Sequence, residues 1–522
     1  ASGSLASEAG ADIRGTLGLQ DVAATHGAHG PLLSAGSGQL SFNKTSLSLP
    51  RFDAQLMGRP FHLELAIDDF QRLDARGVVR GAVDLAQVAR MRGSTAPPEG
   101  VAAFDLAFAG PARQPGALRL TGPVRLTQVT YRSESLAVPA VISSATIQLT
   151  GDGISAERIP VQLGTSDVAL SLNAPGMLAY ALAKGATDSP PDAEFTLTST
   201  RLDLSEVMVE SETGYGALMS ARLAGKQVGG RDPGELAAEK YKLPPLPPVN
   251  ARGQVRIDEL INPPNRVRNL SFRLRLRDGV LDVLNLSGRS YGGRLSGQMS
   301  LDFRSRQAPF PLTYDLKLED ANAATLVQRW TRLGAPISGR TDFTIAGTAA
   351  LDGTMLPTLD GLLANGNAKF REGRFEQFAL TNALASQLRL DASKLSGFQD
   401  FGGGFEIKDG KFLVQGWQFL SGDFTGAISG SAGLGGSLDL ALDLDIPVAT
   451  LQKAGLAQGG LADLLGQLAG SDQKIDVAVG IGGTMSQPVL QLDNEAIQQQ
   501  LTNMLQGQGR DLLQRLFKPP PD

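Results

Sequence analysis

The amino-acid sequence predicts a mostly β fold, in which an elongated, curled antiparallel sheet forms a repeating β-groove, with a few short helices and a C-terminal amphipathic helix. Three observations predict it. Many segments alternate apolar and polar residues, which is the period of a strand with one solvated face. The 62 glycines and 29 prolines interrupt the chain too often for long helices, although 42% of the residues are hydrophobic. Two stretches also share one order of strands and turns, which indicates a degenerate internal repeat.

The clearest alternation lies in two segments. In "GSLDLALDLDIP" one face of the strand would carry Leu438, Leu440, Leu442, Leu444 and Ile446. In "NLSFRLRLRDG" one face would carry Leu270, Phe272, Leu274 and Leu276. Arginines alternate with these four residues, and the Asp278-Gly279 pair that follows predicts a hairpin turn.

Other segments follow the same rules. Further strands are expected at residues 124–131, 145–149, 168–172, 255–260, 343–346, 405–407, 412–414 and 475–481. The two stretches that share one order of strands and turns are "DGVLDVLNLSGRSYGGRLSGQMSLD" and "DGKFLVQGWQFLSGDFTGAISGSAGL". Short helices are expected at residues 323–332, 381–388 and 460–468, and a Gln-rich amphipathic tail helix at 495–517.

Two polar or proline-rich segments divide the chain. They are "KGATDSPPDAE" and the longer stretch that ends in "LPPLPPVN". We therefore expect four regions: an N-terminal β-repeat region (1–183), a linker and Pro-rich connector with short strands (184–250), a β-groove region (251–492) and an amphipathic helical tail (493–522). The sequence leaves open whether residues 1–183 continue the same groove or form a separate lobe.

Charge and composition exclude several classes of function. Lys and Arg number 48 against 53 Asp and Glu, a net charge of −5, so no global field favours nucleic acid. The absence of cysteine excludes disulfides, thiol catalysis and cysteine metal sites. No apolar run approaches the roughly 18 residues that cross a bilayer. Because the chain begins with Ala1 and not with Met, we expect that an N-terminal targeting or anchoring segment has been removed.

One motif resembles a catalytic site. "GRSYG" matches the nucleophile elbow of a hydrolase, with Ser290 as the nucleophile. That mechanism needs a histidine after the serine, whereas His26, His29 and His62 all precede it. Its flanks also indicate strand–turn–strand, not strand–turn–helix. We therefore predict no catalytic residue and no enzymatic activity.

Metal binding is also not expected. "HGAH" supplies two imidazoles, which do not make a closed site. The carboxylates of Asp439, Asp443 and Asp445 would lie along an extended strand and not around one point. The sequence therefore predicts neither a metal nor a cofactor.

A long sheet with a continuous apolar face must cover that face. It closes into a barrel, pairs as a sandwich or curls around a ligand. The repeat cadence and the low aromatic content of 6% favour a curled groove that shelters acyl chains, although a sandwich core stays open as the alternative. The residues nominated for a lipid-binding groove are Leu270, Phe272, Leu274, Leu276, Phe412, Val414, Leu438, Leu440, Leu442, Leu444 and Ile446.

At this point a family resemblance becomes specific. The stretch "GQVRIDELINPPNRVRNLSFRLRLRDGVLDVLNLSGRSYGGRLSGQMSLD" is similar to the C-terminal repeat of the AsmA-like family. "YDLKLEDANAATLVQRW", "ISGRTDFTIAGTA", "ALDLDIPVATL" and "IGGTMSQPVLQLD" resemble further elements of that family, which is related in design to TamB and YhdP. The resemblance covers residues 251–493. Residues 1–183 share only the general pattern of alternating strands and turns.

The resemblance implies a periplasmic protein of outer-membrane biogenesis, with phospholipid or another acyl-chain lipid as its ligand. It implies phospholipid movement between inner and outer membranes, and a tether to the inner membrane through an N-terminal helix absent from this chain. A second hypothesis is a scaffold or assembly factor for outer-membrane proteins that moves no lipid, with an outer-membrane or periplasmic protein bound at the tail. A carbohydrate-binding sandwich is disfavoured, because Trp330 and Trp417 are too few for aromatic platforms.

Overall fold

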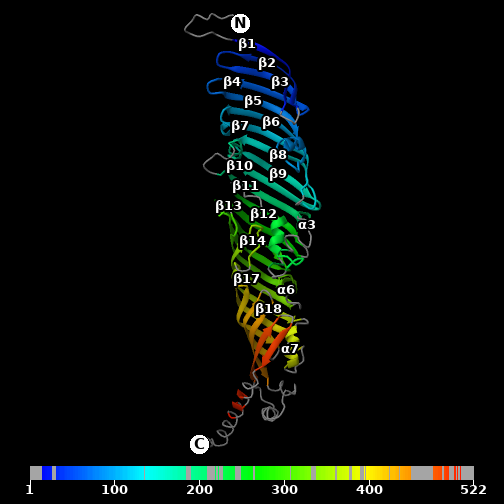
Figure 1. Cartoon of the computed structure of the whole chain (residues 1–522), viewed down its shortest axis with the longest axis vertical. Helices are drawn as coiled ribbons and strands as arrows, with labels where there is room; N and C mark the ends of the chain where they lie inside the picture. The colour runs from blue at the N-terminus through cyan, green and yellow to red at the C-terminus, as the bar shows by residue number, and fades with distance from the viewer. Residues whose placement is uncertain are drawn as a thin grey trace, which may run out of the picture. The chain divides into compact units, whose positions relative to one another are not determined.

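The computed structural model confirms the predicted fold class: a curled, mostly antiparallel β-sheet of 24 strands with a few short helices (Figure 1). It describes residues 14–25, 31–133, 136–183, 190–207, 218, 221–222, 227–240, 249–262, 265–305, 307–330, 337–358, 361–375, 379–387, 393, 396–421, 424–433, 436–447, 474–484, 487–492, 499–500, 502–503 and 506.

The chain divides into two compact units. Unit 1 comprises Ala1–Glu210 and Pro245–Asn285, and unit 2 comprises Ser211–Pro244 and Leu286–Asp522. Strand β14 (Val280–Ser290) spans the division. The four regions expected from the sequence follow composition and not contacts, and they stay predictions.

Unit 1 is built from strands that pair in chain order. Its strands are β1 (Gly15–Thr25), β2 (Pro31–Phe42), β3 (Leu47–Leu56), β4 (Arg59–Ile67), β5 (Asp74–Asp84), β6 (Glu99–Pro111), β7 (Arg119–Tyr131), β8 (Ala140–Gly151), β9 (Ile154–Leu163), β10 (Ser166–Ala174), β11 (Asp192–Asp203), β12 (Asn250–Asn262) and β13 (Asn265–Arg277). Each pairs with the next, antiparallel in every case but one. The helical segments are α1 (Leu85–Met91), η2 (Pro115–Ala117), α2 (Met177–Leu182) and α3 (Leu204–Val207).

The exception is the pair β11 and β12, which run parallel. A parallel pair cannot be joined by a tight hairpin and needs a crossover connection of a dozen residues or more. Residues 204–249, which are part of the linker and connector expected at 184–250, join the two strands, and their part from 211 to 244 belongs to unit 2. The structure therefore departs from a purely antiparallel meander at the Pro-rich connector.

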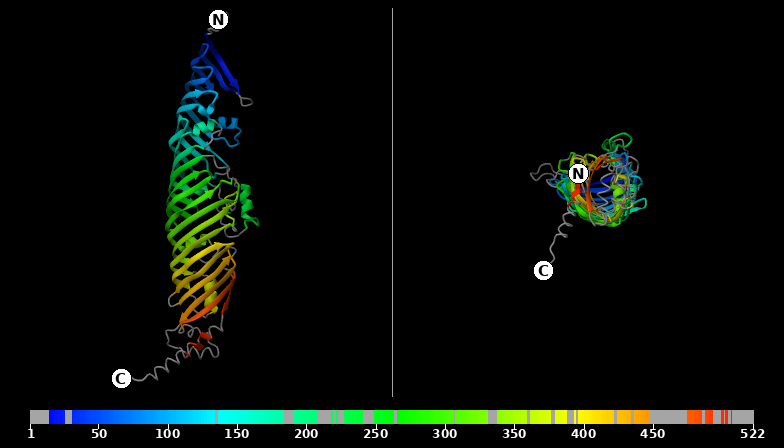
Figure 2. Two further views of the ribbon diagram at one scale, coloured as in Figure 1. Left: turned by 90° about the vertical axis from the view of Figure 1, so that its left-hand side faces the viewer. Right: turned by 90° about the horizontal axis from the view of Figure 1, so that it is seen from below.

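Unit 2 continues the same construction. Its strands are β15 (Gly293–Asp302), β16 (Phe310–Asn322), β17 (Ile337–Leu351), β18 (Leu363–Phe375), β19 (Gly397–Lys408), β20 (Lys411–Ser421), β21 (Phe424–Gly433), β22 (Leu438–Pro447), β23 (Lys474–Gly483) and β24 (Pro488–Leu492). Every successive pair is antiparallel. The helices are α5 (Pro233–Lys240), α6 (Ala323–Trp330) and α7 (Ala379–Gln387). In Figure 2 the strands of unit 2 curl, and α7 lies beside the last of them.

Two-residue Asp-Gly turns follow strands β13 and β19. The Asp278-Gly279 pair has positive φ at both residues (48° and 78°), as does Asp409-Gly410 (51° and 67°). Such φ values match the mirror-image turns whose twist suits a hairpin. The turn at Asp278-Gly279 was expected, and strands were expected on both sides of Asp409-Gly410, where β19 pairs with β20.

The predicted helices fall into two groups. Residues 323–332 and 381–388 correspond to α6 and α7, so these two predictions are confirmed. Residues 460–468 lie outside the described residues, as does most of the expected tail helix at 495–517. Of that tail, residues 499–500, 502–503 and 506 are described, all as helix. Gln500 accepts a hydrogen bond from the backbone N–H of Asp476 on β23 (3.1 Å).

Candidate functional site

The apolar face of unit 1 is a set of side chains that lie in register on successive strands. One row crosses β4 to β8 through directly paired residues: Phe61, Gly81, Phe104, Val124 and Ile147. A second row crosses the same strands: Leu65, Gly77, Phe108, Leu120 and Gly151. None of these positions carries a charge. Because side chains alternate along a strand, the two rows belong to one face of the sheet.

Glycine on one strand repeatedly faces an aromatic ring on the next. A Cβ built on Gly77 would lie 2.7 Å from Cζ of Phe108, and one on Gly81 would lie 3.0 Å from Cζ of Phe104. The rings therefore cover the glycines, a device that stabilises glycine positions in sheets. As a result the aromatic side chains lie along the face of the sheet, which stays shallow.

The same face continues over β9 to β13. One row runs through Ala156, Leu172, Phe195, Gly253 and Leu274. Of the residues nominated from the sequence, Leu274 and its neighbour Phe272 are partly exposed. Leu270 and Leu276 lie on the same face and are each 8% exposed. These four are brought together on β13, as the alternation predicts.

Exposure distinguishes this face from a closed core. Of the ten residues in the two rows over β4 to β8, Gly151 alone is buried and the other nine are partly exposed. The buried cluster of unit 1 is small and comprises Leu49, Phe52 and Ala54, with partly buried apolar residues around it. The two rows over β4 to β8 are therefore partly accessible, whereas Leu106, Ala145 and Ala156 on the same face are buried.

The apolar face of unit 2 is different at its C-terminal strands. The nominated residues Val414, Leu438, Leu442, Leu444 and Ile446 all belong to one buried cluster, and Ile446 is fully buried. Phe412 and Leu440 are partly buried and pack against the same cluster. The cluster joins β17 to β23 with α6 and α7, and so forms a core in which these side chains contact one another.

Aromatic rings consolidate the core of unit 2. Phe405 stacks on Phe412 with ring centroids 4.8 Å apart, and Phe401 meets the edge of Trp417 at 5.3 Å. Trp417 is 8% exposed, and its indole N–H donates to the carbonyl of Gly404 (2.7 Å). Trp417 therefore serves packing and is not a surface platform.

The polar face of unit 1 carries a ladder of charged side chains. The ring of His62 lies between two carboxylates, with Nδ1 2.8 Å from Asp53 and Nε2 3.2 Å from Glu64. Arg80 extends the ladder, with Nη1 3.3 Å from Glu64 and Nε 3.0 Å from Asp105. Hydrogen bonds to Asp53 and then Glu64 raise the pKa of His62. The hydrogen bond to His62 lowers the pKa of each carboxylate.

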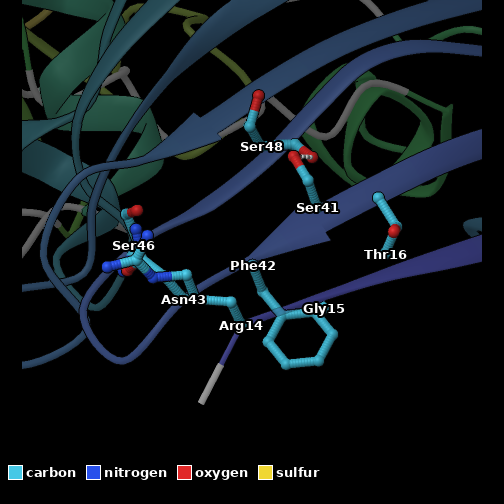
Figure 3. A pocket seen from close by; sticks show the side chains of 8 residues that line it. All are labelled: Arg14, Gly15, Thr16, Ser41, Phe42, Asn43, Ser46 and Ser48. Atoms are coloured by element: carbon cyan, nitrogen blue, oxygen red, sulfur yellow. Dashed lines mark hydrogen bonds between the residues drawn. The ribbon is translucent and has the colours of Figure 1, made fainter. Parts of the chain in front are cut away.

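Two surface depressions lie in unit 1. The first, of about 490 Å³, is lined by hydroxyls of β1 to β3, and Figure 3 shows Thr16, Ser41 and Ser48 there. Asn43 shapes its rim, because its side-chain oxygen accepts the backbone N–H groups of Thr45 (2.9 Å) and Ser46 (2.8 Å). The second, of about 560 Å³, begins at β9 and crosses β10 to β13. It is lined by the apolar row Ala156, Leu172, Phe195, Gly253 and Leu274 and also by polar residues such as Glu194, Arg252, Gln254, Arg273 and Arg275.

Two sequence motifs resembled a catalytic site, at Ser290, and a metal site, at His26 and His29. Ser290 is the last residue of β14 and is 5% exposed, and the turn Tyr291-Gly292 leads directly into β15. Its strand–turn–strand context was expected. His26 and His29 lie outside the described residues. Within the described ranges, no group of three or more His, Cys, Asp or Glu side chains is placed to hold a metal ion.

The acidic residues of β22 lie on the side opposite the core. Asp439, Asp443 and Asp445 are exposed and spread along the strand, as the alternation predicts. Asp445 is paired with Asp476 on β23. Burial, and then the charges of Asp443 and Asp445, raise the pKa of Asp476.

No known protein family, curated protein or solved structure matches the chain. Within the part of the chain that the structure describes, no helix is long and apolar enough to cross a membrane.

Sequence analysis missed much of the apolar face of unit 1. The signal was present in two short alternations: "FHLELAI" places Phe61, Leu63, Leu65 and Ile67 on one face, and "FDLAF" does the same for Phe104, Leu106 and Phe108. The pairing of glycines with rings could not be found, because it depends on the register between strands.

Proposed function

We propose that the chain binds acyl-chain lipid, with phospholipid as the principal ligand, on the apolar face of unit 1. In this proposal it is a periplasmic protein of envelope biogenesis, of the AsmA-like kind, that conducts phospholipid between inner and outer membranes. The observation that carries the proposal is the continuity of that face. Uncharged residues, most of them apolar and partly exposed, follow one another in register across β4 to β8 and again across β9 to β13.

The physical argument rests on the cost of leaving such a face in water. Each methylene transferred from water to an apolar surface contributes about 0.8 kcal/mol. Neighbouring strands are about 4.8 Å apart, so a row across five strands spans roughly 20 Å. A lipid chain laid across the strands would contact the row from Phe61 to Ile147 along its length. The glycines beneath the rings keep that path free of projecting side chains.

The proposal concerns unit 1 because the nominated residues of unit 2 contact other side chains. Leu444 is 2% exposed and Ile446 is fully buried, so neither presents a surface to a ligand. In unit 1 the partly exposed Phe272 and Leu274 keep the role that the alternation suggested. The proposed lipid contacts are therefore these two residues and the rows over β4 to β8.

The decisive experiment measures lipid retention by the purified full chain. The chain is incubated with vesicles of phosphatidylethanolamine and phosphatidylglycerol, purified again, and extracted for lipid mass spectrometry. Val79→Asp places a charge on the apolar face, and we expect it to reduce retained lipid at least tenfold. Val78→Asp is the matched control, because Val78 is adjacent in β5 and faces the polar side, opposite Glu64. It should retain wild-type amounts.

Two outcomes would overturn the proposal. Wild-type chain that retains no lipid is one. Equal retention by the Val79→Asp and Val78→Asp variants, with both folded by circular dichroism, is the other.

A second candidate function is a scaffold for outer-membrane proteins without lipid transport. It is favoured by the edge strand β1, which the described pairings join to β2 alone. Leu17 on β1 is 53% exposed, and a free strand edge can pair with a strand of another protein. Leu17→Pro would remove a backbone donor from that edge. We expect it to abolish recovery of a bound outer-membrane protein if this function holds, whereas unchanged recovery would exclude β1 as the docking strand.

A further inference from the structure

Along the apolar face of β11 the side chains change from apolar to charged within a few positions. Phe195 and Leu197 are apolar and partly exposed. Ser199 follows on the same face, and Arg201 comes next. The face thus offers hydrocarbon contacts, then a hydroxyl, then a guanidinium, in a single line along one strand.

Among the residues that the structure describes, the Ser199 hydroxyl has no hydrogen-bond partner. Ser199 is 5% exposed, and none of the described residues makes a hydrogen bond with its Oγ. It is paired with Ile257 on β12, which is 6% exposed and offers only hydrocarbon. Buried hydroxyls in proteins are nearly always hydrogen-bonded, so each exception calls for an explanation. Leu197 and Arg201, two residues away in either direction, are partly exposed, so a ligand on this face would lie against both neighbours of Ser199.

Arg201 lies where the apolar face ends. Its Nη2 is 3.2 Å from the carboxylate of Asp203, and its Nη1 is 3.7 Å from that of Glu259. Glu259 also pairs with Arg266 at 3.2 Å, so it keeps a cationic neighbour if Arg201 turns away. The Arg201 side chain is 41% exposed. A guanidinium in such a position can exchange a long contact for the two oxygens of a phosphate.

We propose that Ser199 and Arg201 fix the position of an ester-linked glycerophospholipid on the apolar face of unit 1. The Ser199 hydroxyl donates to an acyl-ester carbonyl, Arg201 binds the phosphate, and the acyl chain runs over Leu197 and Phe195. Two strand residues span about 6.6 Å, a separation suited to an ester and a phosphate joined through a glycerol backbone. This inference rests on the proposed lipid-binding function and names the residues that orient the lipid.

The test compares ester and ether lipids. The full chain is incubated with vesicles that contain equal amounts of dipalmitoyl phosphatidylglycerol and its dihexadecyl ether analogue, and the lipid it retains is quantified by mass spectrometry. The ether lacks the carbonyl acceptor. We expect wild type to prefer the ester about threefold to tenfold, the range that one hydrogen bond supports. Ser199→Ala should retain both lipids equally, and Thr198→Ala, on the opposite face, should keep the preference.

A second comparison addresses Arg201. Wild type should retain phosphatidylglycerol in preference to diacylglycerol, and Arg201→Gln should lose that preference. Arg256→Gln, on the polar face of β12, is the matched control and should keep it. Ester preference that persists in Ser199→Ala would overturn the inference, as would equal retention of ester and ether by wild type. Both results leave lipid binding itself intact, whereas a wild type that retains neither lipid overturns the proposed function as well.

Discussion

The apolar faces of the two units are made from the same kind of strand and are used differently. In unit 1 the residues of the rows over β4 to β8 are mostly half-buried, and the buried cluster has three members. In unit 2 the corresponding face of β17 to β23 meets itself and α7 in a core where Ile446 and Ile475 are fully buried. Alternation thus decides which face is apolar, while the elements around it decide whether that face becomes a core or an open surface.

The largest expected difference concerns a charge placed on each face. Leu442 is 4% exposed in the core of unit 2, so Leu442→Asp would bury an unpaired carboxylate at a cost above about 4 kcal/mol. Leu65→Asp on the partly exposed face of unit 1 should cost about 1–2 kcal/mol, because the new side chain keeps access to water. Hydrogen exchange with mass spectrometry would show protection lost across β21 to β23 in the first variant and kept across β3 to β5 in the second. Equal losses would contradict the distinction between core and open face.

Removal of an aromatic ring from each face should give a smaller difference in the free energy of unfolding between the two units. Phe401 is 8% exposed and contacts Phe370 and Trp417, so Phe401→Ala should cost about 3–5 kcal/mol. Phe104→Ala should cost about 1–2 kcal/mol, because its ring is already partly in water. Urea unfolding followed by circular dichroism measures both variants, and a loss for Phe104→Ala as large as that for Phe401→Ala would contradict the distinction between core and open face.

Two glycines allow a still finer comparison. A Cβ on Gly77 would lie 1.9 Å from the carbonyl of Glu64, and one on Gly366 would lie 2.1 Å from that of Thr344. Each also meets a ring, but Phe108 can move towards solvent whereas Phe405 is 5% exposed. We expect Gly366→Ala to destabilise the protein by about 3 kcal/mol and Gly77→Ala by about 1–2 kcal/mol, within the range for overpacking.

The glycine comparison has an internal control. Gly18→Ala should be neutral within about 0.5 kcal/mol, because no atom lies near its Cβ position. Thermal unfolding of the three variants measures the order, and a larger loss for Gly77→Ala than for Gly366→Ala would refute the explanation by ring mobility.

The smallest effect is the pH dependence of the ladder on the polar face of unit 1. The pKa of His62 is raised above its ordinary value of 6.5, so its contribution is complete below that pH and is lost as the pH rises through the raised pKa. The pKa values of Asp53 and Glu64 are lowered, so their contributions are lost only as the pH falls through those values.

The effect on stability should be small, because both carboxylates are exposed to solvent. NMR titration of the His62 ring, with Asp53→Asn as the comparison, would measure it. A His62 pKa that does not fall in Asp53→Asn would contradict the assignment.

The sequence was sufficient for the strand content and for several turns. Alternation over residues 438–446 and the Asp-Gly pairs at 278–279 and 409–410 each correspond to a strand or turn of the structure. These signals are local, and local signals are what a single sequence carries. The sequence indicated residues 184–250 only as a linker and connector with short strands, so the parallel pairing of β11 with β12 could not be predicted. That pairing depends on where the chain returns to the sheet.

The candidate site was predictable only in part. Leu274 and Leu442 have the same alternating context, yet Leu274 is partly exposed and Leu442 is buried. Periodicity identifies the apolar face of a strand but carries no information about what lies over it. Ser199 is similarly inconspicuous in the sequence, since its burial depends on strands that are distant along the chain.

The pairing of nearly every strand with its immediate neighbours in sequence has an evolutionary consequence. Within each unit, the energy of a strand depends mainly on the two strands beside it, as in repeat proteins whose stability is a sum of nearest-neighbour terms. A hairpin can then be duplicated or deleted without redesign of the remainder. Selection can then adjust the length of the apolar face one hairpin at a time, and each added hairpin lengthens it by about 10 Å.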